Sequence, residues 1–341
     1  MNGLAARPGH NEDHARPGHH DPQGGFRNPW PRATQPVFTG MLRWAVTRTV
    51  KPRIDRTPRR SFPTATPDYR TPRAATEDVS LTWVGHATFL LQLGGRNVLT
   101  DPIWSERCSP VQFAGPRRYM APGIPFEELP PIDLVLLSHD HYDHLDTATV
   151  QRIASAHPDA RWLVPMGLVP FIEQLGAREI GELDWWAELE IDGLALTCVP
   201  AQHFSGRGMQ RNRSLWCGWV VASATRKLYF VGDTGRHSSF PEIAARLGPF
   251  DAVMMPIGAY DPSWFMAPVH INPEEAVDSF VELTNDSGRD CSMVATHWGT
   301  FKLTDEPMTE PPERVKTAWK RAGLNPEQLW IMSHGETRWL G

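Results

Sequence analysis

The residues best suited to chemistry in this 341-residue sequence form one dense cluster. Positions 138 to 144 read Ser-His-Asp-His-Tyr-Asp-His, and they directly follow the apolar run Ile132 to Leu137. Imidazole nitrogen and carboxylate oxygen, without cysteine, are ligands typical of zinc or a neighbouring first-row ion. The sequence therefore predicts a metal site at the end of a buried strand.

The spacing inside this cluster suggests places for two ions. His139 and His141 are two residues apart, so in an extended turn they point the same way and can hold one ion. Asp143 and His144 begin the next turn and face a second ion, while Asp140 points elsewhere. Asp146 then stands where it can cap a following helix.

Further ligands are expected at the ends of other predicted strands. His203 follows the run Leu194 to Val199, Asp233 follows Lys227 to Val231, and His297 follows Ser292 to Ala295. Because the carboxyl ends of strands are where ligands converge in α/β sheets, these side chains should meet at one edge. The candidate metal ligands are His139, His141, Asp143, His144, His203, Asp233 and His297.

The chain around these residues predicts an α/β fold. Two β-rich runs separated by Gly94-Gly95 indicate a hairpin, and later apolar strands alternate with helical segments. Further strands are expected at Ala252 to Pro256 and Gln328 to Met332. Helices are expected at Thr147 to Ala156, Pro241 to Leu247, Pro273 to Leu283 (capped by Asn272) and Glu313 to Arg321.

The motif His139-x-His141-x-Asp143-His144 resembles the signature of the metallo-β-lactamase superfamily. The resemblance implies a four-layer αββα sandwich and two zinc ions, although iron or manganese also suits these ligands. It implies that His139, His141 and His203 hold the first ion. Asp143, His144 and His297 would hold the second, and Asp233 would bridge both.

Within that superfamily the chain is similar to the N-acylphosphatidylethanolamine phospholipase D group. The similar segments include FRNPWP, TWVGHAT, TDPIWSERCSP, PAQHFSGR, PIGAYDPSWF, HINPEEAV and HWGTF. The resemblance implies hydrolysis of that phospholipid to phosphatidic acid and an N-acylethanolamine. It also implies a homodimer, catalytic roles for Asp143 and His270, and contact between Tyr260 and the substrate. For His270 a simple helix-capping role is the alternative, whereas His86 and His334 are interpreted as structural or supporting residues.

Charge divides the chain into unequal parts. Residues 1–75 hold 13 Lys or Arg against 5 Asp or Glu, and the remainder holds 21 against 34. Residues 1–36 are expected to be a disordered tail, residues 37–77 a basic amphipathic segment and linker, and residues 78–341 the hydrolase domain. The basic segment can lie on an anionic membrane surface with Leu42 and Trp44 inserted, or it can pack on the body of the protein.

Composition limits the remaining function classes. The four cysteines form no Cys-x-x-Cys pair, and no apolar run is long enough to span a membrane, so a cytoplasmic, soluble or peripheral protein is expected. The acidic body argues against a nucleic-acid partner. A soluble phosphodiesterase or lactonase with the same ligands stays open as an alternative, as does a noncatalytic metal-binding scaffold.

Overall fold

Two mixed β-sheets form the centre of the computed structural model, which describes residues 18–30, 38–50, 61–284 and 290–341. Each sheet has seven strands, in the spatial orders β16-β1-β2-β3-β4-β5-β6 and β15-β14-β13-β12-β11-β8-β7. The first sheet consists of β1 (Val79–Gly85), β2 (Thr88–Leu93), β3 (Arg96–Thr100), β4 (Leu134–Leu136), β5 (Arg161–Pro165), β6 (Glu179–Leu183) and β16 (Thr337–Leu340). The second consists of β7 (Glu188–Ile191), β8 (Leu194–Val199), β11 (Gly218–Ala222), β12 (Lys227–Phe230), β13 (Ala252–Pro256), β14 (Ser292–Thr296) and β15 (Leu329–Trp330).

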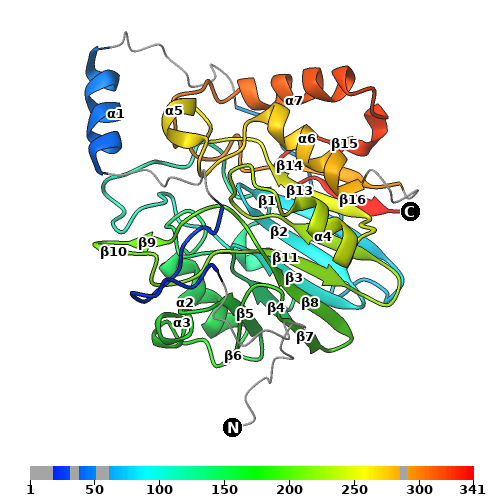
Figure 1. Cartoon of the computed structure of the whole chain (residues 1–341). Helices are drawn as coiled ribbons and strands as arrows, with labels where there is room; N and C mark the ends of the chain where they lie inside the picture. Colours follow the sequence, from blue (N-terminus) through cyan, green and yellow to red (C-terminus); the bar gives the residue numbers. More distant parts are fainter. Residues whose placement is uncertain (1–17, 31–37, 51–60, 285–289) are drawn as a thin grey trace.

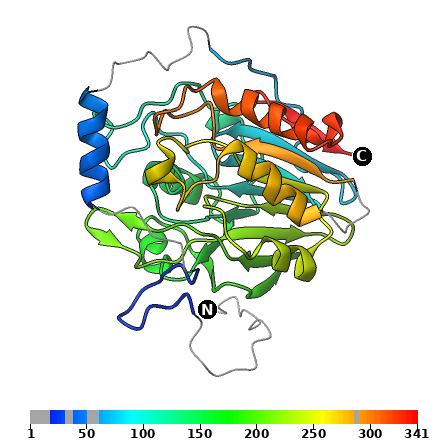
Figure 2. The ribbon, with the colours of Figure 1, turned by 45° about the horizontal axis from the view of Figure 1, so that its top comes forward.

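Helices cover the outer face of each sheet (Figures 1 and 2). The first sheet is covered by α2 (Thr147–Ala156) and α3 (Val169–Gln174), and the second by α4 (Phe240–Leu247), α6 (Pro273–Thr284) and α7 (Glu310–Arg321). The other elements are α1 (Phe38–Val50), α5 (Ser263–Met266), the hairpin of β9 (Gly206–Arg207) and β10 (Gln210–Arg211), and two 3-10 helices at Phe126–Glu128 and Pro326–Gln328. The expected αββα sandwich is therefore confirmed.

Strand β2 shows why this sequence builds two cores. Its side chains alternate, so that Phe89 and Leu91 enter the core between the sheets while Leu90 enters the core beneath α2 and α3. All six residues of the strand are buried. Because both faces are covered, the strand is apolar throughout instead of alternating with polar residues.

Local turn and cap chemistry sets several boundaries as expected. Gly94 and Gly95 connect β2 to β3 with φ angles of 59° and 71°, which suit a two-residue hairpin turn. Asn272 opens α6, since its Oδ1 accepts from the Glu275 amide at 2.9 Å and its own amide donates to the Glu275 carboxylate at 3.0 Å. Asp146 does precede α2, but its carboxylate accepts from the Ser105 amide and the Thr149 hydroxyl instead of capping the helix amides.

The expectation of a disordered tail over residues 1–36 is wrong for residues 18–30, which we call the strap. Phe26 is buried in the main core, and its amide donates to the carbonyl of Asn212 at 2.9 Å. His19 and His20 each place Nε2 2.7 Å from a different carboxylate oxygen of Asp184. The strap is held by the separate side chains of Phe26, His19 and His20. Because it forms no helix or strand, its sequence shows no periodic pattern. Residues 1–17 and 31–36 lie outside the described residues.

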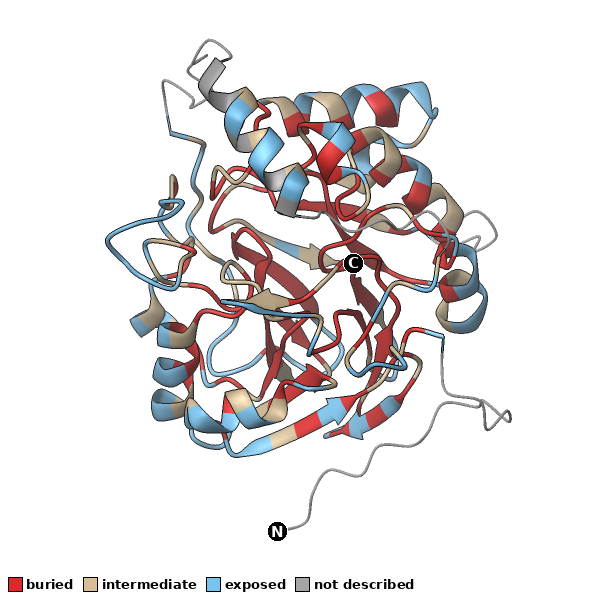
Figure 3. Ribbon diagram, turned by 60° about the vertical axis from the view of Figure 1, so that its left-hand side comes forward, coloured by how far each residue is buried: buried red, intermediate tan, exposed pale blue. Residues whose placement is uncertain are grey.

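Helix α1 forms as expected and rests on α5 through one face. The Trp44 indole donates to the Asp305 carboxylate at 2.9 Å and packs near the ring of Phe265. The Trp44 side chain thus faces the protein, as in the alternative that the segment packs on the body, and insertion of the segment in a membrane stays a prediction. Leu42 and Val46 lie on the other face and are 57% and 54% exposed. Exposed residues recur along α1 (Figure 3). Within the described ranges, no helix is long and apolar enough to cross a membrane.

His237 gives the fold a measurable dependence on pH. It is buried after β12, stacked on Phe240 and 4.6 Å from the ring of Trp30 in the strap. Burial, aided by the Arg236 charge, lowers the pKa of His237 to about 3. His237 therefore stays uncharged in the folded protein, whereas in the unfolded protein it binds a proton below its ordinary pKa of 6.5. The free energy of unfolding consequently decreases as the pH falls from 6.5 toward 3.

We predict that His237→Phe reduces this sensitivity to acid. Between pH 6.5 and 5.5 the free energy of unfolding of the variant should fall by roughly 1 kcal/mol less than that of the parent, because the unfolded histidine is already half protonated at its ordinary pKa and takes up the rest of the proton over this interval. Urea unfolding of both proteins at several pH values measures the difference. Parallel pH profiles for the two proteins would contradict the prediction.

Candidate metal centre

The seven predicted ligands lie together between the two sheets. His139 belongs to the loop after β4 of the first sheet, whereas His203, Asp233 and His297 follow β8, β12 and β14 of the second. These four side chains are all buried. Two sheets thus bring ligands from opposite sides to one point, as the sequence pattern of strand ends predicts.

The first group consists of His139, His141 and His203. His139 Nε2 lies 2.9 Å from His141 Nδ1, and His203 Nε2 lies 3.1 Å from the same atom. Three ring nitrogens therefore face a common point, with geometry suited to one ion.

The second group consists of Asp143, His144 and His297. His144 Nε2 is 3.3 Å from Asp143 Oδ2 and 3.3 Å from His297 Nε2. His297 Nε2 is in turn 3.5 Å from Asp143 Oδ2. Two imidazoles and one carboxylate thus offer a second set of ligand atoms.

Asp233 lies between the two groups. Its Oδ2 is 3.7 Å from His203 Nε2 of the first group and 3.2 Å from His144 Nε2 of the second, while Oδ1 is 3.2 Å from His297 Nε2. Oδ1 is also buried without a hydrogen-bond partner among the described residues. A buried carboxylate in this position fits a bridge between two cations.

The distal ring nitrogens are held by the protein. His139 Nδ1 is 2.8 Å from the Ser138 hydroxyl, His203 Nδ1 is 2.8 Å from the Val269 carbonyl, and His144 Nδ1 is 2.7 Å from an Asp101 oxygen. Such contacts fix ring orientation and leave the opposite nitrogen available for a metal. The donor set therefore fits a metal site.

The charges of the cluster act differently on its members. Burial would lower the pKa of His144 and His297, but Asp233 and Asp143 raise it, that of His297 to about 9, so a metal at these two rings would displace protons. Burial alone would raise the pKa of Asp143 and of Asp233, but the neighbouring imidazoles, His144 first among them, hold both well below the ordinary carboxyl range. Burial lowers the pKa of His139 and His203 well below the usual histidine value. Ionised carboxylates and neutral imidazoles are the forms that bind metal.

Asp101 is a functional residue that the sequence analysis missed. It is fully buried, and its carboxylate accepts from the Ser138 amide at 2.7 Å, the Ser138 hydroxyl at 2.5 Å and the His144 ring at 2.7 Å. Its backbone has a φ of 32° just after β3. An aspartate directly after a buried strand is the same signal that identified Asp233, so the sequence offered the clue.

The structure places the four accessory candidates differently. His334 is buried with its Nε2 2.9 Å from the Thr300 hydroxyl. His86 Nε2 lies 2.9 Å from Asp143 Oδ2, which agrees with a supporting role. His270 Nδ1 lies 3.9 Å from Asp233 Oδ2, and Asn272, not His270, caps α6. Tyr260 is not brought to the metal ligands, because its hydroxyl lies 2.8 Å from the Glu310 carboxylate and faces a neighbouring hollow.

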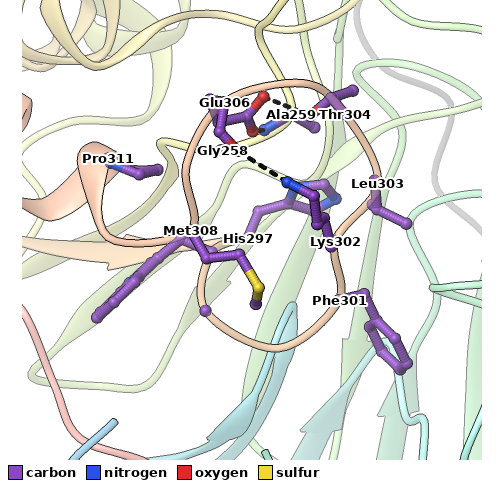
Figure 4. Close-up of a pocket in the computed structure, with 12 residues that line it drawn as sticks. Gly258, Ala259, His297, Phe301, Lys302, Leu303, Thr304, Glu306, Met308 and Pro311 are labelled. Atoms are coloured by element: carbon purple, nitrogen blue, oxygen red, sulfur yellow. Dashed lines mark hydrogen bonds between the residues drawn. The ribbon is translucent and has the colours of Figure 1, made fainter. Parts of the chain in front are cut away.

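A cavity of about 280 Å³ opens above the cluster. His141, Asp143, Asp233 and His270 lie at its polar base, and its other lining residues are largely apolar: Trp44, Phe204, Ala259, Phe265, Met266, Val269 and Leu303, with Arg211 and Thr304. The loop after His297 contributes one wall. Glu306 accepts from the Ala259 amide at 2.7 Å and the Thr304 hydroxyl at 2.6 Å, which joins that loop to the one after β13 (Figure 4).

The strap also reaches the ligand loops. The Asn28 side-chain amide donates to the carbonyl of His203 at 2.8 Å. Phe26 bonds to Asn212 in the loop that follows His203. The N-terminal segment thus supports the peptide that carries one of the ligands.

Comparisons with known proteins agree with this arrangement. The model of the β-lactamase superfamily domain matches residues 96–298. An uncharacterized protein of Mycobacterium tuberculosis is 43% identical, over 76% of this chain and 69% of its own length. The N-acyl-phosphatidylethanolamine-hydrolyzing phospholipase D 1 of Caenorhabditis elegans is also 43% identical, over 69% of this chain and 68% of its own. Among solved structures, the metallo hydrolase Igni18 of Ignicoccus hospitalis superimposes with a TM-score of 0.59 at 21% identity, covering 77% of this chain and 99% of that one.

A buried His/Asp cluster between two mixed sheets, open to a cavity, defines a metal-dependent hydrolase. The chain belongs to the β-lactamase superfamily, since the family model covers more than half of it and the relatives match along most of their length.

Proposed function

We propose that this protein is a binuclear zinc phosphodiesterase that hydrolyses N-acylphosphatidylethanolamine to phosphatidic acid and an N-acylethanolamine. The observation that carries the proposal is the pair of ligand groups joined by Asp233 at the base of a largely apolar cavity. The worm relative, named for hydrolysis of this phospholipid, supports the choice of substrate. Elemental analysis of the purified protein distinguishes zinc from iron or manganese.

The proposed site would hold one ion with His139, His141 and His203, and the other with Asp143, His144 and His297. Asp233 would contact both. Bound there, the two ions would supply Lewis acidity and make water nucleophilic at neutral pH.

The side chains of the protein have distinct parts in the proposed reaction. Asp143, kept ionised, would orient the attacking water and accept its proton. His270 stands at the edge of the cluster, where it would donate a hydrogen bond to the phosphate or to the leaving oxygen. The apolar walls from Phe204, Phe265 and Val269 would exclude water and receive the start of the lipid chains.

The test is lipid turnover together with metal analysis. The purified protein is mixed with N-acylphosphatidylethanolamine in mixed micelles, and phosphatidic acid is measured with and without a chelator. Two zinc ions per chain and chelator-sensitive release of phosphatidic acid are the expected results. Two metals with turnover only of soluble diesters or lactones would contradict the lipid substrate, and less than one metal per chain would contradict the metal centre.

We further predict that α1 docks the enzyme on anionic membranes through its exposed face. Leu42 and Val46 project from α1 beside Arg43, and α1 lies on the same side of the molecule as the β9–β10 hairpin (Figures 1 and 2). Because a buried aliphatic side chain contributes roughly 1.5–3 kcal/mol, Leu42→Asp with Val46→Asp should weaken vesicle binding at least about 10-fold.

Vesicle sedimentation measures this binding, and Thr39→Asp serves as the matched control. Thr39 is exposed on the same helix, so the control adds negative charge without removing an apolar side chain. Turnover of a soluble diester should be unchanged in all three proteins. Equal vesicle binding by the double variant and the parent would refute membrane docking by α1.

A further inference from the structure

Arg211 lines the cavity above the candidate metal ligands, and no charged partner for it is found among the described residues. Its guanidinium lies over the ring of Phe204, 4.6 Å from the ring centre, and both residues line the same cavity as His141 and Asp143. No described residue forms an ion pair or a side-chain hydrogen bond with Arg211. Both Asp143 and Asp233 share the cavity, yet neither forms an ion pair with this guanidinium.

The hairpin that carries Arg211 is fixed to the ligand loop. The Asp140 carboxylate accepts from the Gly206 amide at 2.6 Å. The Arg207 guanidinium donates to the carbonyls of Asp140 and Leu145 at 2.8 and 2.7 Å. Arg207 thus attaches the hairpin to the loop that carries the candidate metal ligands. Arg211 lies on the other strand of that hairpin, so its position beside these ligands is fixed as well.

Several arginines over aromatic rings elsewhere in the described chain have protein partners. Arg118 and Arg207 donate to backbone carbonyls, and others pair with acids. Arg246 lies 4.3 Å from the centre of the Trp186 ring and forms an ion pair with Glu242 at 2.9 Å. Arg314 lies over Tyr260 and pairs with Glu274 and Glu310. Arg211 pairs with no acid among the described residues, and it is exposed at the cavity, although burial of part of its surroundings lowers its pKa below the ordinary arginine value. A cation at a cavity without a paired acid is available to an anion that enters.

We propose that Arg211, seated on Phe204, is an anion subsite that binds a non-bridging phosphate oxygen of the substrate diester. This inference rests on the proposed function and adds the residue that selects a phosphodiester over a neutral lactone or ester. A guanidinium presents two parallel N–H donors that match phosphate oxygens, and such charge-assisted bonds are stronger than neutral ones. The same chemistry would also suit the phosphate of a neighbouring lipid, so the test separates the two sources.

The experiment compares Arg211→Gln and Arg211→Lys with the parent on bis(4-nitrophenyl) phosphate, a soluble diester that is presented without any lipid. Arg211→Gln should raise KM about 10-fold or more, as loss of one hydrogen bond to a charged group does, with kcat within about 3-fold of the parent. Arg211→Lys should recover part of the loss, because it restores the charge without the two-donor geometry. Metal content should stay the same. Arg246→Gln removes an arginine that lies over the Trp186 ring and does not line the cavity, so it should leave both constants unchanged.

Each alternative result has a definite meaning. An unchanged KM for the soluble diester in Arg211→Gln overturns the subsite, even where the KM for micellar lipid rises, because Arg211 would then contact a neighbouring headgroup. A fall in kcat with loss of metal also overturns it, since Arg211 would then act on the fold of the ligand loop.

The subsite is testable even where the proposed function fails. A protein that hydrolyses soluble diesters but not the N-acylated phospholipid still gives the KM comparison above. For a protein that hydrolyses no phosphodiester, calorimetric titration with inorganic phosphate replaces turnover. Binding about 10-fold weaker in Arg211→Gln than in the parent supports the subsite, and equal binding refutes it.

Discussion

Asp143→Asn is expected to lower kcat about 10³-fold while the protein keeps most of its metal. Asp143 faces His144 and His297 at 3.3 and 3.5 Å and lies 2.9 Å from His86, so an amide of the same shape fits the position. The amide has neither the negative charge nor the basicity that the proposed proton transfer needs, and such transfers contribute roughly 10²–10⁴ in rate. The remaining six ligands are unchanged. Single-variant kinetics together with elemental analysis measure the effect.

The control for this prediction is Asp159→Asn, which makes the same chemical change at an exposed turn before β5. Its kcat should equal that of the parent. Turnover by Asp143→Asn near the parent value, with metal content intact, would remove Asp143 from the mechanism.

Asp101→Asn is expected to lower metal affinity 10- to 100-fold, although Asp101 is not a predicted ligand. Its carboxylate orients the His144 ring and receives two bonds from Ser138, all within a fully buried site. Loss of an outer partner of this kind typically costs that factor in affinity. The free energy of unfolding should also fall by about 3 kcal/mol, because a buried charged pair loses one member. Chelator competition and urea unfolding measure the two effects.

Asp133→Asn is the matched control for the second effect. Asp133 belongs to the same sheet layer, precedes β4, and pairs with Arg73 and the Asn97 amide away from the cluster. This control should lose stability without losing metal affinity. If Asp101→Asn and Asp133→Asn lost equal metal affinity, the loss would follow from lower protein stability and not from the contact between Asp101 and His144.

Buried strands and the ligands behind them were predictable because their physical signals are local. The bounds of β8, β13 and α2 agree with the sequence prediction, since each is an apolar or periodic run between clear turn residues. The loop after β4 contains three histidines and two aspartates within residues 139–144, more than an exposed turn needs for solubility. Spacing within this loop separated two pairs of candidate ligands, and the resemblance to a family assigned His203, His297 and Asp233 to these pairs.

The missed elements depend on contacts distant in the sequence. Strand β16 pairs with β1, more than 250 residues earlier, and nothing within its four residues signals that pairing. Strand β6 at Glu179–Leu183 carries two glutamates and a glycine, so its pattern is weak although it lies at the sheet edge. The strap has no periodicity because separate side chains anchor it. Arg211 was missed because its significance comes from the absence of an acidic partner, which only the three-dimensional arrangement reveals.

The pairing of β16 with β1 has a consequence for how the protein is made. The ribosome adds residues 79–183, which supply six strands of the first sheet, long before residues 337–340 that cover the outer edge of β1. During that interval the apolar strand VSLTWVG presents unpaired amides and carbonyls, the pattern that recruits strands from other chains. Nascent chains should therefore need protection by chaperones until residues 337–340 have been added, and deletion of residues 337–341 would leave the edge of β1 uncovered permanently.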